Sequence, residues 1–330
     1  MEIRLAQEGD IPEIVSLLKL GLGESLLPKS EIYWRWKHQD NPFGKSLVLL
    51  ARDKNKIVGV RTFMRWKWRS GEQIIEAVRG VDTVVHPDYQ GNGMFGKLTL
   101  ALIDHCRENE YGLLFSTPNK KSKRGYTKLG WAEAGKLPIQ MKMIRPVSMM
   151  LDVVLRKKTK QDTTLKKDES IAYYLNNAGL PNLIASNNLL YGSHVITEHS
   201  VDTLKWRYAN VPVAEYHVGG VEDKELRALF FYRIKYTFAG KELRITDVFL
   251  SDRKYVQDLK QILDDKVQEH NADYITSGSF GIANLLGTNM LVLKRKVGPT
   301  VMIHNIMLPD LSNFTDFEGW SPSFGDLELF

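Results

Sequence analysis

The chain has 330 residues, of which 43% are hydrophobic and 25% are charged, and its formal net charge is +6. This length suffices for two domains of ordinary size, and the composition is that of a globular protein and not of a disordered or fibrous one. The single cysteine, Cys106, excludes an internal disulfide bond. The N-terminal residues do not have the form of a signal peptide, and no apolar run is long enough to span a bilayer. We therefore expect a cytoplasmic protein without membrane insertion.

The first 145 residues predict a mixed sheet with helices. Apolar residues recur at helical spacing after Asp10, which we expect to cap that helix, and again after Gly93, where Cys106 lies on the core face. Alternating or continuous apolar runs separated by turns predict the strands. The predicted strands are residues 3–5, 47–51, 57–67, 77–85 and 113–116. This order of strands and helices is typical of an α/β fold.

Residues 84–97 form the most informative motif. They read Val-Val-His-Pro-Asp-Tyr-Gln-Gly-Asn-Gly-Met-Phe-Gly-Lys, so a strand leads through a turn and a glycine-rich loop into a helix. Glycines let the main chain approach an anion closely, and the start of a helix offers free backbone N–H groups. The motif predicts a phosphate-binding loop, and an ordinary strand-turn-helix connection is the alternative.

The loop resembles the acetyl-CoA pyrophosphate loop of the GCN5-related N-acetyltransferase (GNAT) superfamily. That pattern is Arg or Gln, two residues, Gly, one residue, then Gly or Ala; here Gln90 and Gly93 match, whereas Phe95 departs from it and Gly96 follows. A second stretch agrees, because Asn119 follows an apolar strand and Tyr126 begins a Tyr-x-x-x-Gly-Trp run. The resemblance covers about residues 1–145.

This resemblance implies acetyl-CoA as the co-substrate. The residues that it places against acetyl-CoA are Val84 and Val85 through the main chain, Gln90, Gly91, Asn92, Gly93, Met94, Phe95 and Gly96 in the loop, and Asn119 on the pantetheine arm. In the superfamily, a main-chain N–H on the strand before the loop, here near Val85, polarises the thioester carbonyl.

The resemblance also implies catalytic residues. Tyr126 matches the tyrosine that faces the CoA sulfur, and a phenol can give a proton to a departing thiolate. A base is useful because a free primary amine has a pKa of about 10. Asp82 is the first candidate for this base and Glu76 the second. A structural role is the alternative for Asp82, because an Asp recurs at the corresponding position 247.

A basic segment and a repeat organise the rest of the chain. Residues 148–170 are rich in lysine and poor in apolar residues, which indicates an interdomain connector, with a membrane-surface helix as the alternative. Beyond it, Trp36-Lys37-His38 recurs as Trp206-Arg207-Tyr208, and the Arg-x-x-Asp run at 79–82 recurs at 244–247. These repeats predict an internal duplication. The second copy runs through residues 251–258 into its helix without a glycine loop, so we expect no phosphate site there.

We therefore predict an α/β fold (α+β mixed sheet) of two acyl-CoA N-acyltransferase-like domains in tandem. The predicted boundaries are 1–147 for the domain with the acetyl-CoA site, 148–170 for the connector, and 171–330 for a degenerate second domain with its tail. The tail from Thr300 is expected to pack back across a domain surface.

The leading functional hypothesis is an acetyl-CoA-dependent N-acetyltransferase that acts on a primary amine of a small-molecule or sugar-linked acceptor by direct attack in a ternary complex. The alternatives are an aminoacyl-tRNA-dependent aminoacyltransferase of the peptidoglycan type and a non-catalytic acyl-CoA-binding protein. The eight histidines show no paired metal spacing, so we expect no metal cofactor. A basic strand face at Arg61, Arg65, Lys67 and Arg69 favours an exposed hairpin over nucleic-acid binding.

Overall fold

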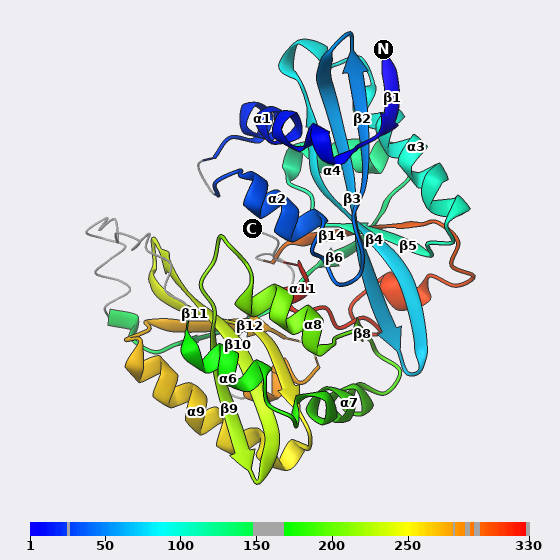
Figure 1. Cartoon of the computed structure of the whole chain (residues 1–330). Helices are drawn as coiled ribbons and strands as arrows, with labels where there is room; N and C mark the ends of the chain where they lie inside the picture. Colours follow the sequence, from blue (N-terminus) through cyan, green and yellow to red (C-terminus); the bar gives the residue numbers. More distant parts are fainter. Residues whose placement is uncertain (25–26, 148–167, 280, 288–290, 294–297, 328–330) are drawn as a thin grey trace. The chain divides into compact units, whose positions relative to one another are not determined.

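The computed structural model describes residues 1–24, 27–147, 168–279, 281–287, 291–293 and 298–327. The chain folds into two compact units, whose elements are coloured along the sequence in Figure 1. Unit 1 comprises Met1–Gly135 and Pro299–Gly319, and unit 2 comprises Lys136–Gly298 and Trp320–Leu329. Each unit contains a mixed sheet, which confirms the predicted α/β fold with two acyltransferase-like domains.

Unit 1 is a mixed sheet with helices on both faces. Its elements are β1 (Glu2–Leu5), α1 (Ile11–Leu22), α2 (Glu31–His38), β2 (Leu47–Asp53), β3 (Lys56–Ser70), β4 (Gln73–Val85), α3 (Met94–Glu108), β5 (Leu113–Ser116), α4 (Lys120–Lys128), β6 (Ala132–Lys136) and β14 (Thr300–Asn305). The strand order is β1-β2-β3-β4-β5-β14-β6. Strands β1 to β4 pair antiparallel, β4 and β5 pair parallel, and β5 and β14 pair antiparallel.

The two faces of this sheet bury different helices. Val48 and Leu50 pack with α1, whereas the alternate residues Leu49 and Ala51 pack with α3. Successive side chains of a strand point to opposite faces, so α1 and α3 cover opposite sides of the sheet, as Figure 1 shows. The helical spacing after Asp10 and after Gly93 predicted both helices.

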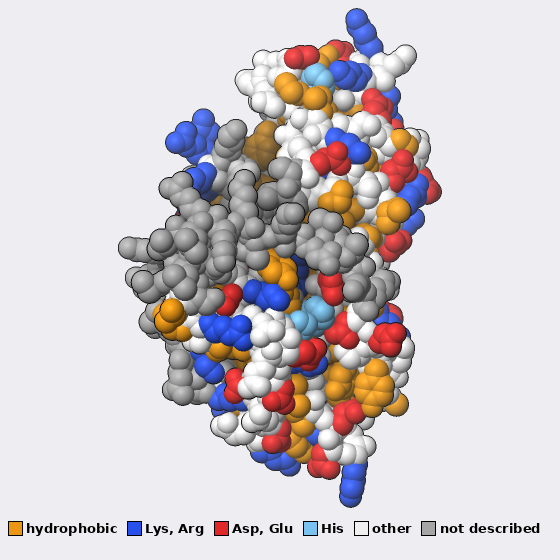
Figure 2. All heavy atoms as spheres, turned by 90° about the vertical axis from the view of Figure 1, so that its left-hand side faces the viewer, with side chains coloured by type: hydrophobic (Ala, Val, Ile, Leu, Met, Phe, Trp, Pro, Cys, Tyr) orange, Lys and Arg blue, Asp and Glu red, His pale blue; other side chains and the backbone are white. Residues whose placement is uncertain are grey.

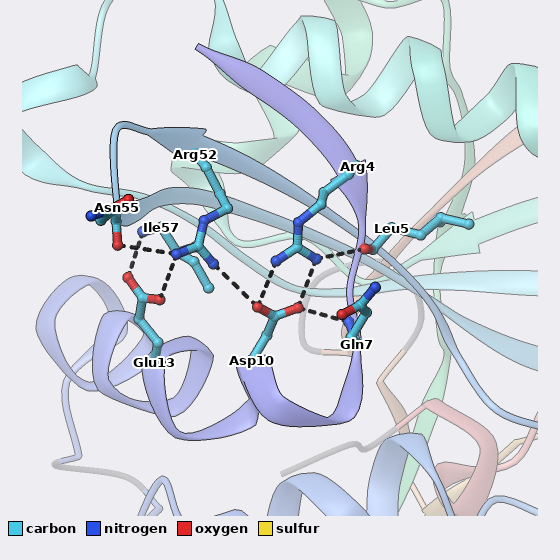
Figure 3. Close-up of polar contacts among 8 residues, drawn as sticks. All are labelled: Arg4, Leu5, Gln7, Asp10, Glu13, Arg52, Asn55 and Ile57. Carbon is cyan, nitrogen blue, oxygen red and sulfur yellow. Dashed lines mark hydrogen bonds and ion pairs between the residues drawn. The ribbon is translucent and has the colours of Figure 1, made fainter.

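Asp10 stands at the start of α1 but does not cap it as predicted. Its carboxylate makes no hydrogen bond to the first turn of α1. It accepts instead from both Nη atoms of Arg4 at 2.8 and 2.7 Å, from the Gln7 amide at 2.7 Å and from Arg52 at 3.2 Å, as Figure 3 shows. Asp10 therefore joins α1 to β1 and β2, because two arginines compete successfully for its oxygens.

Strand β4 contains a bulge at residues 82 and 83, shortly before the glycine-rich loop. Val60 of β3 pairs with Val84, and Thr62 pairs with Val81, so two residues of β4 stand opposite the single residue Arg61. Such a bulge bends the strand. Asp82 lies in this bulge with φ of +39°, a backbone conformation that non-glycine residues rarely adopt.

Unit 2 repeats this architecture. Its elements are β7 (Ile139–Met143), α6 (Glu169–Leu175), α7 (Leu180–Tyr191), β8 (Val195–Thr197), α8 (Val201–Leu204), β9 (His217–Asp223), β10 (Glu225–Thr237), β11 (Gly240–Leu250), α9 (Val256–Glu269), β12 (Tyr274–Gly278), α10 (Ala283–Leu286), β13 (Leu291–Leu293) and α11 (Phe324–Leu327). The strand order is β13-β7-β12-β11-β10-β9, with β11 and β12 parallel. The parallel pair β11–β12 corresponds to β4–β5 of unit 1.

The units exchange strands. β7 follows β6 in the chain, but it pairs with β12 and β13 of unit 2. In the corresponding place of unit 1, next to β5, lies β14 from the C-terminal part of the chain, with Ile303 opposite Phe115. Two predictions therefore need correction. Residues 136–147 belong to unit 2 and not to the first domain, and Thr300–Asn305 joins the sheet of unit 1 as strand β14 instead of packing across a domain surface.

The predicted connector at 148–170 lies mostly outside the described residues, and α6 begins at Glu169. Among the helices that the structure describes, none combines the length and apolarity needed to cross a membrane. On the face drawn in Figure 2, Lys and Arg side chains are interspersed with Asp and Glu side chains wherever described residues are visible. The net positive charge is therefore not gathered into one patch on the visible described part of that face.

Candidate active site

The glycine-rich loop connects β4 to α3 in an open conformation. Gly91 and Gly93 have φ of +82° and +72°, and a Cβ added at either would meet no atom within 4 Å. Gly93 is the N-cap residue of α3, and no side chain caps that end. The amides of the first helical residues, Met94, Phe95 and Gly96, therefore have no acceptor within the helix. No acidic residue lies in the first turn to repel an anion.

The start of the loop is fastened to its own sheet. The Gln90 side chain donates to the Val85 carbonyl at 3.0 Å, and the Tyr89 hydroxyl donates to Asp53 at 2.6 Å. The His86 ring lies 2.9 Å from the Lys56 ammonium. The exposed residues at 90–93 are thus held at the end of β4, with their main chain facing solvent.

Phe95, the departure from the superfamily pattern, packs toward α4. Its ring meets that of Tyr126 edge-on with centroids 5.5 Å apart. A Cβ at Gly125 would stand 3.0 Å from the Phe95 ring, so glycine at 125 provides the room that phenylalanine needs. The side chain therefore lies against α4, and the departure leaves the amides of the loop unobstructed.

Tyr126 is buried between aromatic rings. It is 4% exposed, and its ring lies 4.3 Å from that of Trp131. Its hydroxyl makes no hydrogen bond with any residue that the structure describes, and it lies 3.3 Å from where a Cβ on Gly80 would stand. Gly80 directly follows Arg79, the last residue of β4 to pair with β5. The hydroxyl thus faces the point where β4 and β5 separate.

Asp82 is part of a buried ionic group on the α2 side of the bulge. Its carboxylate contacts the Lys37 ammonium at 2.6 Å and His38 Nε2 at 2.9 Å. Burial by itself would raise the pKa of this carboxyl, but the Lys37 charge and the His38 hydrogen bond outweigh burial and hold the pKa far below its ordinary value. Asp82 is therefore a carboxylate anion with little tendency to take up a proton.

His38 extends this group toward a cavity. Burial lowers the pKa of His38 more than the neighbouring Asp82 raises it, so the ring is neutral. Because Asp82 only accepts, Nε2 of His38 must donate to it, and Nδ1 must accept from the Ser46 hydroxyl at 2.9 Å. Ser46 and His38 line a cavity of about 260 Å³ beside Trp34 and residues 5–8.

Comparison with known proteins identifies the first unit. Residues 2–134 match the family profile described as Acetyltransferase (GNAT) domain. Residues 2–134 form a GNAT domain. No curated protein matches the chain by sequence.

Solved structures resemble the GNAT domain together with unit 2. A GCN5-related N-acetyltransferase from Anabaena variabilis matches with a TM-score of 0.62 and 16% identity, over 92% of this chain and 73% of that one. Eis1 from Mycobacterium abscessus matches with a TM-score of 0.57 and 10% identity, over 93% of this chain and 74% of that one. An Enterococcus faecalis protein of unknown function, described as a probable N-acyltransferase, matches with a TM-score of 0.66 and 8% identity, over 95% and 74%. At such identities these matches show the fold alone.

The GNAT domain does not bring every predicted site residue together. Val84 packs its side chain against Gly21 of α1, and its main chain pairs with Val60 of β3. The Asn119 side-chain oxygen accepts from the Ser122 amide at 2.9 Å and so caps α4. Glu76 pairs with Lys67 at 2.6 Å and is 43% exposed. Six residues along a strand separate it from Asp82, roughly 20 Å.

Cys106, on the core face of α3 in the GNAT domain, is fully buried, and burial raises the pKa of its thiol to about 12. A buried thiol with a raised pKa carries little thiolate, so Cys106 is a poor nucleophile.

Unit 2 repeats the Asp82 group without the loop. The Tyr208 hydroxyl donates to Asp247, as His38 does to Asp82 in the GNAT domain. Ser30 and Ser200 cap the two corresponding helices through their hydroxyls. Beyond β11, Asp252 leads into α9 with no positive-φ glycine. The duplicated contact therefore has a structural role that does not depend on a phosphate loop.

In unit 2 the space beside β11 is occupied by the chain itself. The backbone of α11 packs at Gly325 against Asp247 and Tyr208, where no Cβ fits. Residues 321–326 leave a cavity of only about 40 Å³ against β11 and Gly278. Burial and the neighbouring Asp326 raise the pKa of Asp247 to about 6. This packing supports the predicted degeneracy of the second domain.

Sequence reasoning missed three residues of the site in the GNAT domain. Lys37 and His38 were noticed only as part of a repeat, and Arg61 only as part of a basic strand face. Arg61 is fully buried and lies beside Tyr126. What distinguishes Arg61 is its position opposite the bulge in β4. The sequence does not reveal this position, because it depends on the register of β3 and β4.

Proposed function

We propose that this chain is an N-acetyltransferase that transfers an acetyl group from acetyl-CoA to a primary amine, with the GNAT domain as its catalytic unit. One observation supports this proposal most strongly. The Gln90–Gly96 loop presents unpartnered amides at the start of α3, with open space at Gly91 and Gly93. Such an arrangement suits a diphosphate, because the amides and the helix dipole both favour negative charge. The residues present therefore fit the diphosphate of CoA.

Each residue then has a role in binding or proton transfer. The amides of Gly91–Gly96 and the Gln90 side chain hold the pyrophosphate, and Asn119, from the start of α4, contacts the pantetheine arm. A main-chain N–H near Val85 polarises the thioester carbonyl, which is effective because such a donor is already fixed in place. Tyr126, whose hydroxyl has no other described partner, gives its proton to the departing sulfur.

Asp82 serves as a positioning residue in this proposal and not as the base. Its ion pair with Lys37 and its depressed pKa make it a poor proton acceptor near neutral pH. Glu76 lies too far along β4 to replace it. We propose that the acceptor amine enters in its neutral form, whose fraction in solution rises about tenfold per pH unit below the pKa of the amine.

The test is an assay of free thiol released from acetyl-CoA in the presence of a panel of primary amines. The proposal predicts release with some amines and a kcat/KM that rises about tenfold per pH unit up to the amine's own pKa. A plateau that begins near neutral pH would show an enzymic base and contradict the role given to Asp82. If the chain binds neither CoA nor acetyl-CoA, an aminoacyl-tRNA donor or a scaffold becomes the better interpretation.

A further inference from the structure

Arg61 of β3 is a buried cation without a matching anion. It is 0% exposed, yet its Nε and Nη2 atoms have no hydrogen-bond partner. Its Nη1 donates to the Thr83 hydroxyl of the β4 bulge. No carboxylate in the described part of the chain forms an ion pair with it. Burying an unpaired charge costs several kcal/mol, so this arginine is not explained by the stability of the fold.

Aromatic rings surround the guanidinium and replace part of its lost hydration. Its Cζ lies 4.6 Å from the centre of the Phe63 ring, 5.4 Å from Tyr126 and 5.5 Å from Phe95. Cation–π contacts of this kind stabilise the guanidinium, but they leave the two N–H groups without acceptors. The rings therefore hold the cation in place and do not neutralise it.

The unpartnered N–H groups and the Tyr126 hydroxyl meet at one point of β4. A Cβ at Gly80 would lie 3.0 Å from Arg61 Nη2 and 3.3 Å from Tyr126 Oη. Gly80 lies just beyond the last pair of β4 with β5, and the Ser116 hydroxyl bonds its carbonyl at 2.8 Å. Arg61 Nη2 and Tyr126 Oη therefore approach the same point of β4.

We propose that Arg61 is a catalytic residue that binds the sulfur of CoA as the thiolate forms. This inference rests on the proposed function, in which Tyr126 faces that sulfur. The amine nitrogen attacks the thioester carbonyl carbon, the new C–N bond forms and the C–S bond breaks. The electron pair of that bond goes to sulfur, where Arg61 stabilises the negative charge until Tyr126 protonates it. The surplus proton of the amide nitrogen passes to water, and water returns a proton to the Tyr126 phenolate, so that the amide and the free thiol of CoA are the products.

The neutral ground state explains why the cation is left unpaired. A thioester carries no charge, so Arg61 gains an ionic partner only when the C–S bond breaks. An interaction that appears only in the transition state lowers the barrier without tightening substrate binding. A permanent carboxylate on the acyl chain is the competing occupant of the same place beside Arg61.

The test compares the full-length chain with Arg61→Met by calorimetry, using CoA and desulfo-CoA from about pH 6 to about pH 9. A thiol has a pKa of about 8.5, and an opposite charge within about 4–6 Å lowers a pKa by about 1–3 units. CoA should therefore gain about 10- to 200-fold in affinity over desulfo-CoA between about pH 6 and about pH 9 in the wild type. In Arg61→Met this gain should be lost, while desulfo-CoA binds as before.

Arg65→Met is the matched control, because Arg65 lies four residues along β3, roughly 13 Å away, on the partly buried end of the strand. It should keep the pH-dependent gain. Arg61→Met should also melt at a higher temperature than the wild type, because an unpaired buried charge is removed. Arg61→Lys keeps the charge and should keep part of the gain.

Four outcomes would overturn the inference. The first is an equal pH-dependent gain in wild type and Arg61→Met. The second is a loss of the pH-dependent gain in CoA affinity in Arg65→Met that equals the loss in Arg61→Met. The third is a lower melting temperature of Arg61→Met with an unchanged pH-dependent gain in CoA affinity, which would show a structural role. The fourth is an Arg61-dependent preference for succinyl-CoA over acetyl-CoA, which would assign the arginine to an acyl carboxylate. Failure of the wild type to bind desulfo-CoA would instead contradict the proposed function itself.

Discussion

Lys37, His38 and Asp82 form an ionic group that holds a strained residue in the β4 bulge. The positive φ of Asp82 costs free energy, and the two contacts to its carboxylate from α2 offset that cost. The same kind of contact in unit 2, from Tyr208 to Asp247, shows that it belongs to the duplicated fold. The main consequence of this ionic group is therefore for the stability of the folded chain.

Asp82→Asn should lower the free energy of unfolding by about 3–5 kcal/mol at pH 7, because it leaves the buried Lys37 ammonium without its anion. The pKa of Asp82 is depressed in the folded state, so its stabilising effect is present above the unfolded-state pKa of about 3.9. It is lost progressively as pH falls below that value. Urea unfolding at several pH values measures both effects.

The exposed Asp88 provides the control for this experiment. Asp88→Asn should change the unfolding free energy by less than about 0.5 kcal/mol at pH 7. If the wild type and Asp82→Asn differ equally at pH 7 and at about pH 2, the ion pair is not the source of the effect.

Tyr126→Phe removes the proposed proton donor and keeps the aromatic packing against Phe95 and Trp131. We expect kcat to fall about 10²-fold, which is typical of losing one general acid, while the affinity for CoA stays the same. Rates with a panel of amines and calorimetric titration of CoA measure the two quantities. Unchanged turnover would exclude Tyr126 as the acid, and weaker CoA binding would indicate a binding role.

The sequence located most of these residues but not their partners. Gln90, Gly93 and Tyr126 could be found because loops and helix ends have local patterns. The ion pair of Asp82 with Lys37 could not be predicted, and neither could its hydrogen bond with His38, which is 44 residues away. The packing of α2 brings both residues near, and the aromatic run at 33–36 did not reveal that helix. Glu76 was the second candidate for the base, but it lies on β4 far from Asp82. Distance along the strand and strand register decide which side chains meet, and the sequence alone did not give them.

At the scale of elements, the loop between β4 and α3 depends on two glycines with positive φ. Gly93→Ala places a side chain at φ of +72°, which costs about 1–2 kcal/mol and disturbs the start of α3. We expect at least about tenfold weaker CoA binding and a lower melting temperature. Calorimetry and thermal unfolding measure these changes.

Gly96→Ala is the matched control, since Gly96 lies inside α3 and an added Cβ would meet only Leu129 at 3.8 Å. Alanine favours a helix over glycine by about 1 kcal/mol, so this variant should melt at or above the wild-type temperature. Equal effects of the two substitutions would show that the positive φ at Gly93 is not what the loop needs.

At the scale of the whole molecule, the exchange of β7 and β14 determines which fragments of the chain can fold on their own. The duplication predicted two similar folds, and the strand orders agree with it. The exchange could not be predicted, because Ile139–Met143 and Thr300–Asn305 are both short strands, and neither sequence indicates whether its place is beside β5 or beside β12. Pairing partners of this kind are set by tertiary packing and not by local sequence.

A fragment ending at residue 147 should therefore not fold, because it lacks β14 and leaves β5 and β6 without the strand between them. Fusing residues 1–137 to residues 298–319 through a short glycine linker should give a folded unit, since Gly298 approaches the Leu137 carbonyl. Cooperative thermal unfolding of the fusion, and its absence in the fragment, is the expected result. A fragment 1–147 that unfolds cooperatively would contradict the exchange.

The central claim is that one acyl-CoA site, formed by the Gln90–Gly96 loop, serves the whole chain, while α11 fills the corresponding space in unit 2. Calorimetric titration of the full-length protein with CoA and acetyl-CoA tests this most directly, because it gives affinity and stoichiometry together. We predict micromolar binding at one site per chain, weakened at least about tenfold in Gly93→Ala and weakened less in Gly96→Ala. Two sites per chain, or binding that Gly93→Ala leaves unchanged, would contradict the account.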